Sequence, residues 1–94
     1  MAQLFVRHKV KDYEKWKASF DEHAEMRQAA GSRGCRLFRE EEDPNEVIVS
    51  CDWESLESAH RFAKSKDLHE AMKRAGVVGK AEIYFLDEVG KVAS

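Results

Sequence analysis

Apolar and polar positions divide the first third of the chain into a strand and a helix. Residues 3–10 are rich in Leu, Phe and Val and stand before Asp12, a residue type that caps helices, which predicts a strand followed by a helix start. Across residues 13–30, large side chains recur at steps of three and four, as on one face of a helix. These side chains are Tyr13, Trp16, Phe20 and His23 or Ala24. Gly31 then ends the predicted helix.

The middle of the chain has the pattern of a hairpin. Residues 33–41 alternate loosely between apolar and polar side chains, and residues 47–53 form a run that is rich in β-branched residues. The Asp-Pro-Asn triplet at positions 43–45 is typical of a tight turn. Together these features predict two antiparallel strands joined by that turn.

A second helix and a last strand complete the order of elements. Residues 55–76 begin with a serine cap, carry helical apolar spacing with a bend near residues 65–67, and end at a glycine. Residues 80–89 read as a strand. The order predicts an α+β, ferredoxin-like βαββαβ fold, with a four-stranded antiparallel sheet and two helical segments on one face. A chain of 94 residues has room for one domain, which we expect to span residues 1–94.

The predicted strands carry large apolar side chains at both parities, so both faces of the sheet are apolar. Phe5, for example, stands between Leu4 and Val6. Helices cover only one face, and the second face therefore needs another apolar surface. A second copy of the chain supplies it most simply, so we expect a homodimer that packs sheet against sheet into an α+β barrel, with an interface of about 1,600 Å². The expected dimer face carries Phe5, Arg7, Ile48, Asp52 and Tyr84.

Two charged residues interrupt the apolar strand segments on that expected dimer face. They are Arg7 on the first strand and Asp52 on the third. Because an isolated charge is costly to bury, we expect them to pair, with each other or between subunits. We therefore assign the two residues to assembly rather than to catalysis.

Charge and strand pattern narrow the range of partners. Sixteen Lys and Arg against eighteen Asp and Glu give a formal net charge of -2, which does not favour binding to a phosphate backbone. RNA-recognition domains share this strand order, but residues 46–53 lack the basic-glycine-aromatic pattern that stacks bases. The sequence also has neither a membrane-spanning apolar segment nor the residue order of an export signal at its start. We expect no nucleic-acid or membrane partner.

The two cysteines favour a reducing compartment. Cys35 and Cys51 are too few for a disulfide scaffold and form no C-x-x-C motif. With the turn at residues 44–45, Cys51 falls roughly opposite Leu37, and Cys35 is only a diagonal neighbour. We therefore expect both thiols to stay reduced and the protein to be cytoplasmic.

Four segments spread over nearly the whole chain carry a family resemblance. They are Val6-Arg7-His8-Lys9-Val10 with Asp12-Tyr13-x-x-Trp16, Asp43-Pro44-Asn45-Glu46-Val47, Asp52-Trp53-Glu54-Ser55-Leu56 and Gly76-Val77-Val78-Gly79. In these segments the chain resembles the dimeric α+β barrel superfamily, in its antibiotic-biosynthesis-monooxygenase-like group. The resemblance implies a ligand pocket between the helices and the concave sheet. It also implies chemistry that ranges from cofactor-free oxidation of aromatic polyketides to haem degradation, because this fold hosts many functions.

The haem-degrading branch of that family does not fit this sequence. Its members use an Asn on the first strand and a Trp and a His on the second helical segment. Aligned without gaps, these positions fall near Val6 and on Phe62 and Met72, which are all apolar. The glycines at 31–34 and 76–79 lack the spacing of a nucleotide-binding loop. We expect no cofactor, and no metal site, because no histidine stands in a metal-binding motif.

His8 is the first candidate for a catalytic base. It has the strand parity expected to face the helices, where a neutral imidazole would accept a proton from a phenol or an acidic C–H group. The alternative is a hydrogen-bonded core histidine. His23 on the first helix is a weaker candidate, and its alternative is a helix-edge residue half in solvent. His60 and His69 are expected to face solvent.

Aromatic and apolar side chains converge on the space between helices and sheet. This arrangement suits a flat hydrophobic ligand, although the same residues would also serve simply as core. The residues are Val6, Trp16, Trp53, Phe62, Met72 and Phe85. We expect a cofactor-independent monooxygenase or cyclase-like enzyme that acts on a small hydrophobic or aromatic substrate. The alternative is a non-catalytic dimeric module that binds a small ligand.

Overall fold

The structure is a computed structural model that describes residues 2–94, which form four strands and four helices. The strands are β1 (Ala2–Val10), β2 (Ser32–Arg39), β3 (Glu46–Trp53) and β4 (Val77–Asp87). The helices are α1 (Tyr13–Glu22), α2 (Ala24–Ala30), α3 (Leu56–Lys64) and α4 (Lys66–Arg74). The strands pair antiparallel in the order β2-β3-β1-β4, so β1 and β3 are central. The ferredoxin-like α+β prediction is confirmed.

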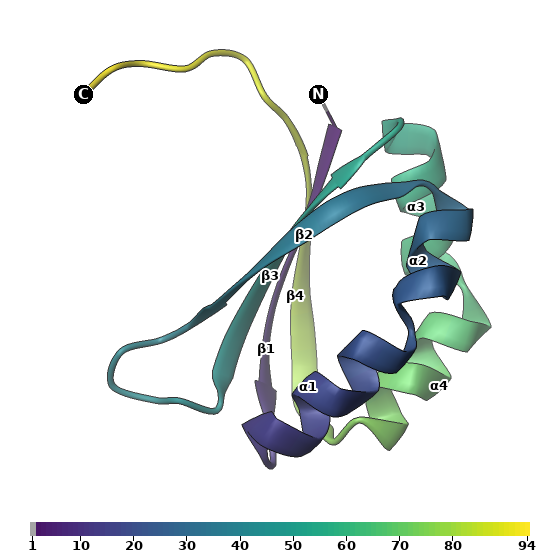
Figure 1. Ribbon diagram of the computed structural model, residues 1–94, viewed down its shortest axis with the longest axis vertical. Helices are drawn as coiled ribbons and strands as arrows, with labels where there is room; N and C mark the ends of the chain where they lie inside the picture. Colours follow the sequence, from purple (N-terminus) through teal and green to yellow (C-terminus); the bar gives the residue numbers. More distant parts are fainter. Residues whose placement is uncertain (1) are drawn as a thin grey trace.

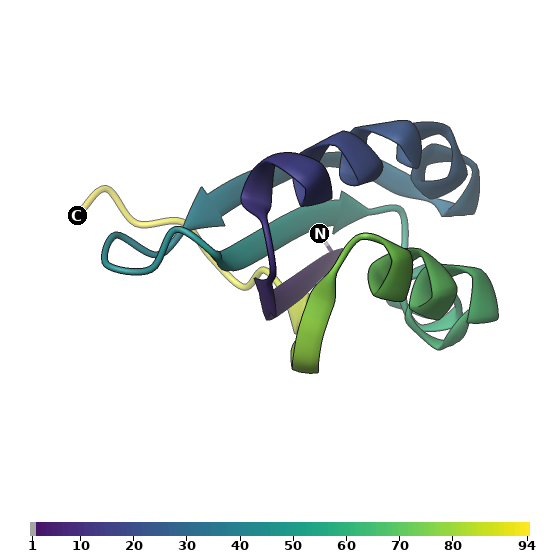
Figure 2. The ribbon, with the colours of Figure 1, turned by 90° about the horizontal axis from the view of Figure 1, so that it is seen from below.

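All helices of residues 2–94 pack on one face of the sheet, and the opposite face is uncovered (Figure 1). Figure 2 shows α1 with α2 and α3 with α4 as two neighbouring pairs over the strands. None of the helices in this part of the chain is long and apolar enough to cross a membrane. The layer of helices on a single side of the sheet gives it two very different faces, one buried and one open.

The first helical segment is broken where one continuous helix was predicted. Asp12 caps α1 as expected, because its side chain accepts hydrogen bonds from two backbone N–H groups of the first turn. The break falls at His23, which ends α1 and begins α2. The apolar stripe runs through the break, so periodicity did not reveal it. Gly31 ends α2 with a φ of 127°, and a Cβ there would lie only 3.0 Å from Ser58 Oγ.

The second helical segment has the bend that the sequence predicts. Ser55 caps α3 through the Ser58 N–H group, and Ser65 caps α4 through the Leu68 N–H group. Ser65 is therefore both the end of one helix and the start of the next. The two helices keep their small apolar side chains, Ala59 and Ala71 among them, against the sheet.

The hairpin between β2 and β3 has the predicted turn but a different register. The triplet at 43–45 lies in the turn, and the Glu40 N–H group donates to the Glu46 carbonyl oxygen, so the loop between these residues is centred on Asp43. Cys35 consequently lies directly opposite Cys51, and Leu37 lies opposite Val49. The two sulfurs form a disulfide, so the prediction of reduced thiols is wrong. The cause is the position of the turn, which is centred on Asp43 and not on residues 44–45, so the partner of Cys51 moves by two residues.

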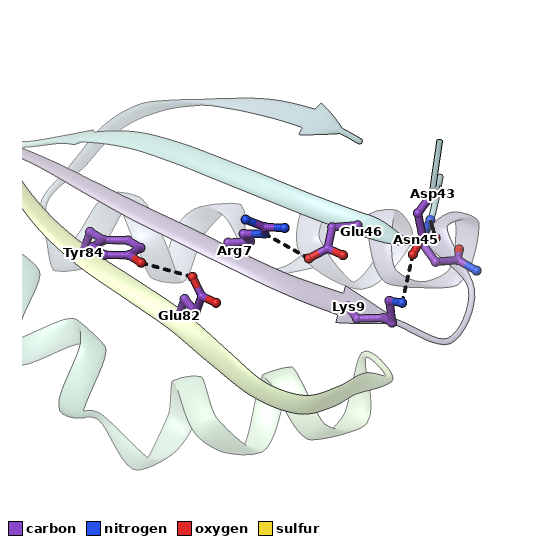
Figure 3. A network of polar contacts seen from close by, with 7 residues as sticks. All are labelled: Arg7, Lys9, Asp43, Asn45, Glu46, Glu82 and Tyr84. Atoms are coloured by element: carbon purple, nitrogen blue, oxygen red, sulfur yellow. Dashed lines mark hydrogen bonds and ion pairs between the residues drawn. The ribbon is translucent and has the colours of Figure 1, made fainter. Parts of the chain in front are cut away.

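The uncovered face of the sheet carries the residues expected there. The strand register places Phe5 beside Tyr84 and Arg7 beside Ile48. The predicted mutual pair of Arg7 and Asp52 is wrong, because the register brings other partners to each. The Arg7 Nε atom donates to Glu46 Oε1 over 3.0 Å, and Asp52 Oδ1 accepts from Gln3 Nε2 over 3.0 Å. Figure 3 shows Arg7 and Glu46 together with the neighbouring Lys9–Asp43 ion pair and Tyr84–Glu82 hydrogen bond.

Candidate functional site

A cavity of about 90 Å³ lies between the helices and the sheet. Its volume is enough for several water molecules or part of an aromatic ring system. Most of the residues that the sequence assigned to a pocket line it, namely Val6, His8, Trp16, His23, Trp53, Phe62 and Met72. The wall is almost entirely apolar, so the few polar atoms on it have large electrostatic effects.

His8 is the most deeply placed titratable side chain of this cavity. The residue is 5% exposed and its ring lies 5.5 Å from the Trp16 ring, measured between centroids. Neither Nδ1 nor Nε2 has a hydrogen-bond partner among residues 2–94, so no protein group in this range holds the ring by a hydrogen bond. Burial lowers the pKa of His8 from 6.5 to about 4. The imidazole is therefore neutral at pH 7, with one ring nitrogen able to accept a proton.

A β-bulge interrupts the sheet at His8. On β1 the pairing with β4 shifts between Arg7 and Lys9, which leaves His8 without a paired residue on that side. On β4 the irregular stretch includes Gly79, whose φ of 71° favours glycine. Bulges bend a strand, re-aim its side chains and occur often beside active sites. The local backbone thus distinguishes His8 from its neighbours on the strand.

The helix side of the cavity is a row of stacked groups. The Trp16 and Phe20 rings stack with centroids 5.0 Å apart, and the Arg27 guanidinium carbon lies 3.6 Å from the Phe20 centroid. His23 lines the same wall, half-buried, with Nδ1 2.7 Å from the Ser19 carbonyl oxygen. When Nδ1 carries the hydrogen and donates this bond, Nε2 is left as an acceptor.

Sequence reasoning missed Arg27, although a signal for it was present. The stripe of Trp16, Phe20 and His23 continues at a step of four to Arg27, so the same helix face presents all four side chains. An apolar helix stripe predicts core side chains, so a charged residue is not expected at this position. Burial lowers the pKa of Arg27 from its usual value, yet a guanidinium remains protonated at pH 7.

The opposite wall consists of aromatic and flexible side chains. Trp53 on β3 and Phe62 on α3 place their ring centroids 4.9 Å apart, and Met72 on α4 lies beside them on the cavity wall. The Trp53 indole Nε1 is buried and has no hydrogen-bond partner within residues 2–94. Buried polar groups usually find a partner, so water or a ligand is the natural one for Trp53 and His8.

Phe85 does not belong to the cavity, in contrast to the sequence-based expectation. It faces the helices, but its ring stacks on His60 with centroids 3.7 Å apart and lies outside the lining. His60 and His69 are both exposed, as predicted for that helical segment. Among residues 2–94, no three His, Cys, Asp or Glu side chains gather closely enough to hold a metal ion.

A second, more polar cavity of about 520 Å³ adjoins the first. It lies between the first helical pair and β2, where Ser32 and Gly34 form part of its wall. Phe20 and Arg27 line both cavities. A ligand larger than the first cavity would therefore extend past these two side chains into the second.

Comparisons with known proteins agree with this architecture. A family model described as antibiotic biosynthesis monooxygenase matches residues 1–74. No curated protein matches the chain. An antibiotic biosynthesis monooxygenase-like protein from Bordetella bronchiseptica is 20% identical, with a TM-score of 0.77 over 94% of this chain and 96% of that one.

Two further solved structures have the same fold at lower identity. SnoaB, a cofactor-independent oxygenase from Streptomyces nogalater, is 14% identical, with a TM-score of 0.77 over 99% of this chain and 97% of that one. A conserved protein from Methanosarcina mazei is also 14% identical, with a TM-score of 0.73 over 94% of this chain and 92% of its own. These likenesses show a common fold.

Proposed function

The chain belongs to the antibiotic biosynthesis monooxygenase family, and we propose that it is a cofactor-independent monooxygenase that acts on a small aromatic substrate. The observation that carries the proposal is His8, a neutral imidazole without a hydrogen-bond partner among residues 2–94, on the wall of an aromatic cavity. The likeness to SnoaB, itself a cofactor-independent oxygenase, supports the same class of reaction.

The proposed reaction begins with proton transfer to His8. A substrate such as anthrone has a CH₂ group that is acidified by its neighbouring rings and carbonyl, so a positioned base generates a resonance-stabilised carbanion. That carbanion transfers electrons to O₂, and the CH₂ group becomes a carbonyl. One oxygen atom enters the product, while the other leaves as water with the two hydrogen atoms of the substrate.

The low pKa of His8 suits this role in the loaded cavity. In the empty cavity the apolar wall disfavours the imidazolium, which keeps the ring neutral and ready to accept a proton. Proton transfer places a new anion on the substrate beside the ring. That anion stabilises the imidazolium, so the pKa of His8 rises as the charge develops.

The test is O₂ uptake with anthrone as the probe, in buffer that contains a chelator and no flavin. We expect His8→Gln, which keeps the side-chain volume but loses the base, to lower kcat about 10²-fold or more. His69→Gln, an exposed histidine on α4, is the matched control and should keep the wild-type rate. A His8→Gln protein with full activity would contradict the proposed mechanism. Binding of the probe without O₂ uptake by the wild type would favour a non-catalytic ligand-binding module.

We also propose that the protein is a homodimer that packs through the uncovered sheet face. Tyr84 is 47% exposed, Leu86 is 42% exposed and Phe38 is 49% exposed. The Phe5 and Tyr84 rings meet edge to face across β1 and β4, with centroids 5.9 Å apart. An apolar surface of this kind is typical of an interface.

Sedimentation velocity at micromolar concentration tests the dimer. The wild type should sediment as a dimer, and Tyr84→Glu should shift the population to monomer, because the second copy would have to bury a carboxylate. Val89→Glu in the exposed C-terminal segment is the control, since Val89 is 96% exposed. A wild-type protein that is monomeric at this concentration would contradict the proposed homodimer.

A further inference from the structure

Arg27 occupies the junction of the two cavities. Its side chain lines both of them, and its guanidinium stacks on the ring of Phe20, which also lines both. Towards the sheet, Phe20 stacks on Trp16, and Trp16 contacts His8. A continuous row of planar groups therefore leads from the candidate base to a half-buried cation.

The charge of Arg27 is not neutralised by an acidic partner. Its Nη1 atom donates to the Phe20 carbonyl oxygen over 2.7 Å, which satisfies one of the five N–H donors of a guanidinium. No carboxylate of residues 2–94 forms an ion pair with it, and Asp21 contributes only a longer-range attraction. By contrast, Arg7, Arg33 and Arg61 each pair with a glutamate at the surface. A half-buried cation with unused donors is a site for an anion.

We propose that Arg27 binds the carboxylate of a planar aromatic substrate whose ring system enters the first cavity, along the row of rings that ends at His8. This proposal rests on the proposed function and names its substrate class. The planar fork of a guanidinium donates two parallel hydrogen bonds to the two oxygens of a carboxylate, and the Phe20 ring packs against that fork. The aromatic part of such a ligand packs against the apolar wall, and its carboxylate binds Arg27. One ligand therefore fits both parts of the site.

The test compares a charged probe with its neutral counterpart. Binding of 1-naphthoate and of methyl 1-naphthoate is measured by calorimetry or by quenching of tryptophan fluorescence, in the intact chain. We expect the wild type to bind the carboxylate at least about tenfold more tightly than the ester. Arg27→Met keeps an apolar stem of similar length and should remove that preference, with little change in ester binding. Arg27→Lys keeps the charge without the fork and should retain only part of the preference.

Arg61→Met is the matched control because it removes the same charge from an exposed position on α3. It should keep the full preference for the carboxylate. A purely structural role of Arg27, through its bond to Phe20, predicts that Arg27→Met lowers the melting temperature while the folded fraction still prefers the carboxylate. That result would overturn the proposal.

The remaining outcomes separate the substrate class from the proposed function. A wild type that binds ester and carboxylate equally well overturns the role of Arg27, while the oxygenase proposal stands if O₂ uptake still depends on His8. A wild type that binds neither probe contradicts the carboxylate site and the aromatic cavity together.

Discussion

The two faces of the sheet are built from alternate residues of the same strands, yet they differ in almost every physical property. On the helix face, Leu4, His8 and Val49 are buried, and His8 has no hydrogen-bond partner within residues 2–94. On the other face, Arg7 and Lys9 belong to ion pairs that water reaches. One residue step along β1 therefore moves a side chain from an apolar cavity to a solvated surface.

This contrast separates chemistry from assembly. A titratable group buried in an apolar cavity undergoes a large pKa shift, as His8 does, because burial disfavours its charged form. The charged groups of the open face are satisfied locally; the hydrogen bond from Lys9, for example, lowers the pKa of Asp43. Exposed pairs of this kind contribute little to stability and serve mainly to limit which surfaces fit together.

The largest expected change in stability comes from alanine substitution of two neighbouring residues of β1, Leu4 on the helix face and Phe5 on the open face. Leu4→Ala should lower the free energy of unfolding by about 2–5 kcal/mol at every protein concentration, because it opens a void in the core. Phe5→Ala should cause a loss that grows smaller at lower protein concentration, since it acts on association of two copies. Urea unfolding at several concentrations measures both. Two losses that are equal and independent of concentration would remove the distinction between the faces.

A smaller effect is expected from acid. In the unfolded chain a histidine binds its proton below pH 6.5, whereas folded His8 binds it only near pH 4. The unfolded state therefore holds more protons in this window, and stability falls as the pH drops from 6.5 to about 4, by up to about 3 kcal/mol. His8→Gln should lack this component. The difference between the two unfolding curves is the measure, because every other titratable group is common to both proteins. Parallel curves would contradict a buried neutral imidazole.

The order of helices and strands could be predicted from local sequence patterns. Most of the cavity residues could be predicted from the side of the strand or helix on which they lie. Three short-range signals indicate the helices, the strands and the inward side of His8. They are the apolar stripe through Trp16 and Phe20, the serine caps, and the strand parity that His8 shares with Leu4. The predictions that were wrong depend on strand register, which is set by residues far apart in the sequence. The disulfide between Cys35 and Cys51 follows from the centre of the hairpin turn at Asp43, and the partner of Arg7 follows from strand pairing.

The remaining misses concern side chains at the edge of the cavity. Phe85 has the parity of a cavity residue, but the His60 ring lies against it and covers it. Arg27 lies on the helix stripe, but only the packing of α2 over β2 shows that its charge has no acidic partner among residues 2–94. Periodicity indicates the direction of a side chain, whereas its neighbours are decided by packing between elements.

The most direct test of the account is the protonation of His8 itself. An NMR titration of the imidazole nitrogens, with the His8 signals assigned by their absence in His8→Gln, reports the pKa of the ring in the folded protein. We predict a midpoint of about 4, with the neutral ring present at pH 7. A midpoint at or above the 6.5 of an ordinary histidine would contradict the buried, neutral imidazole from which the proposed chemistry starts.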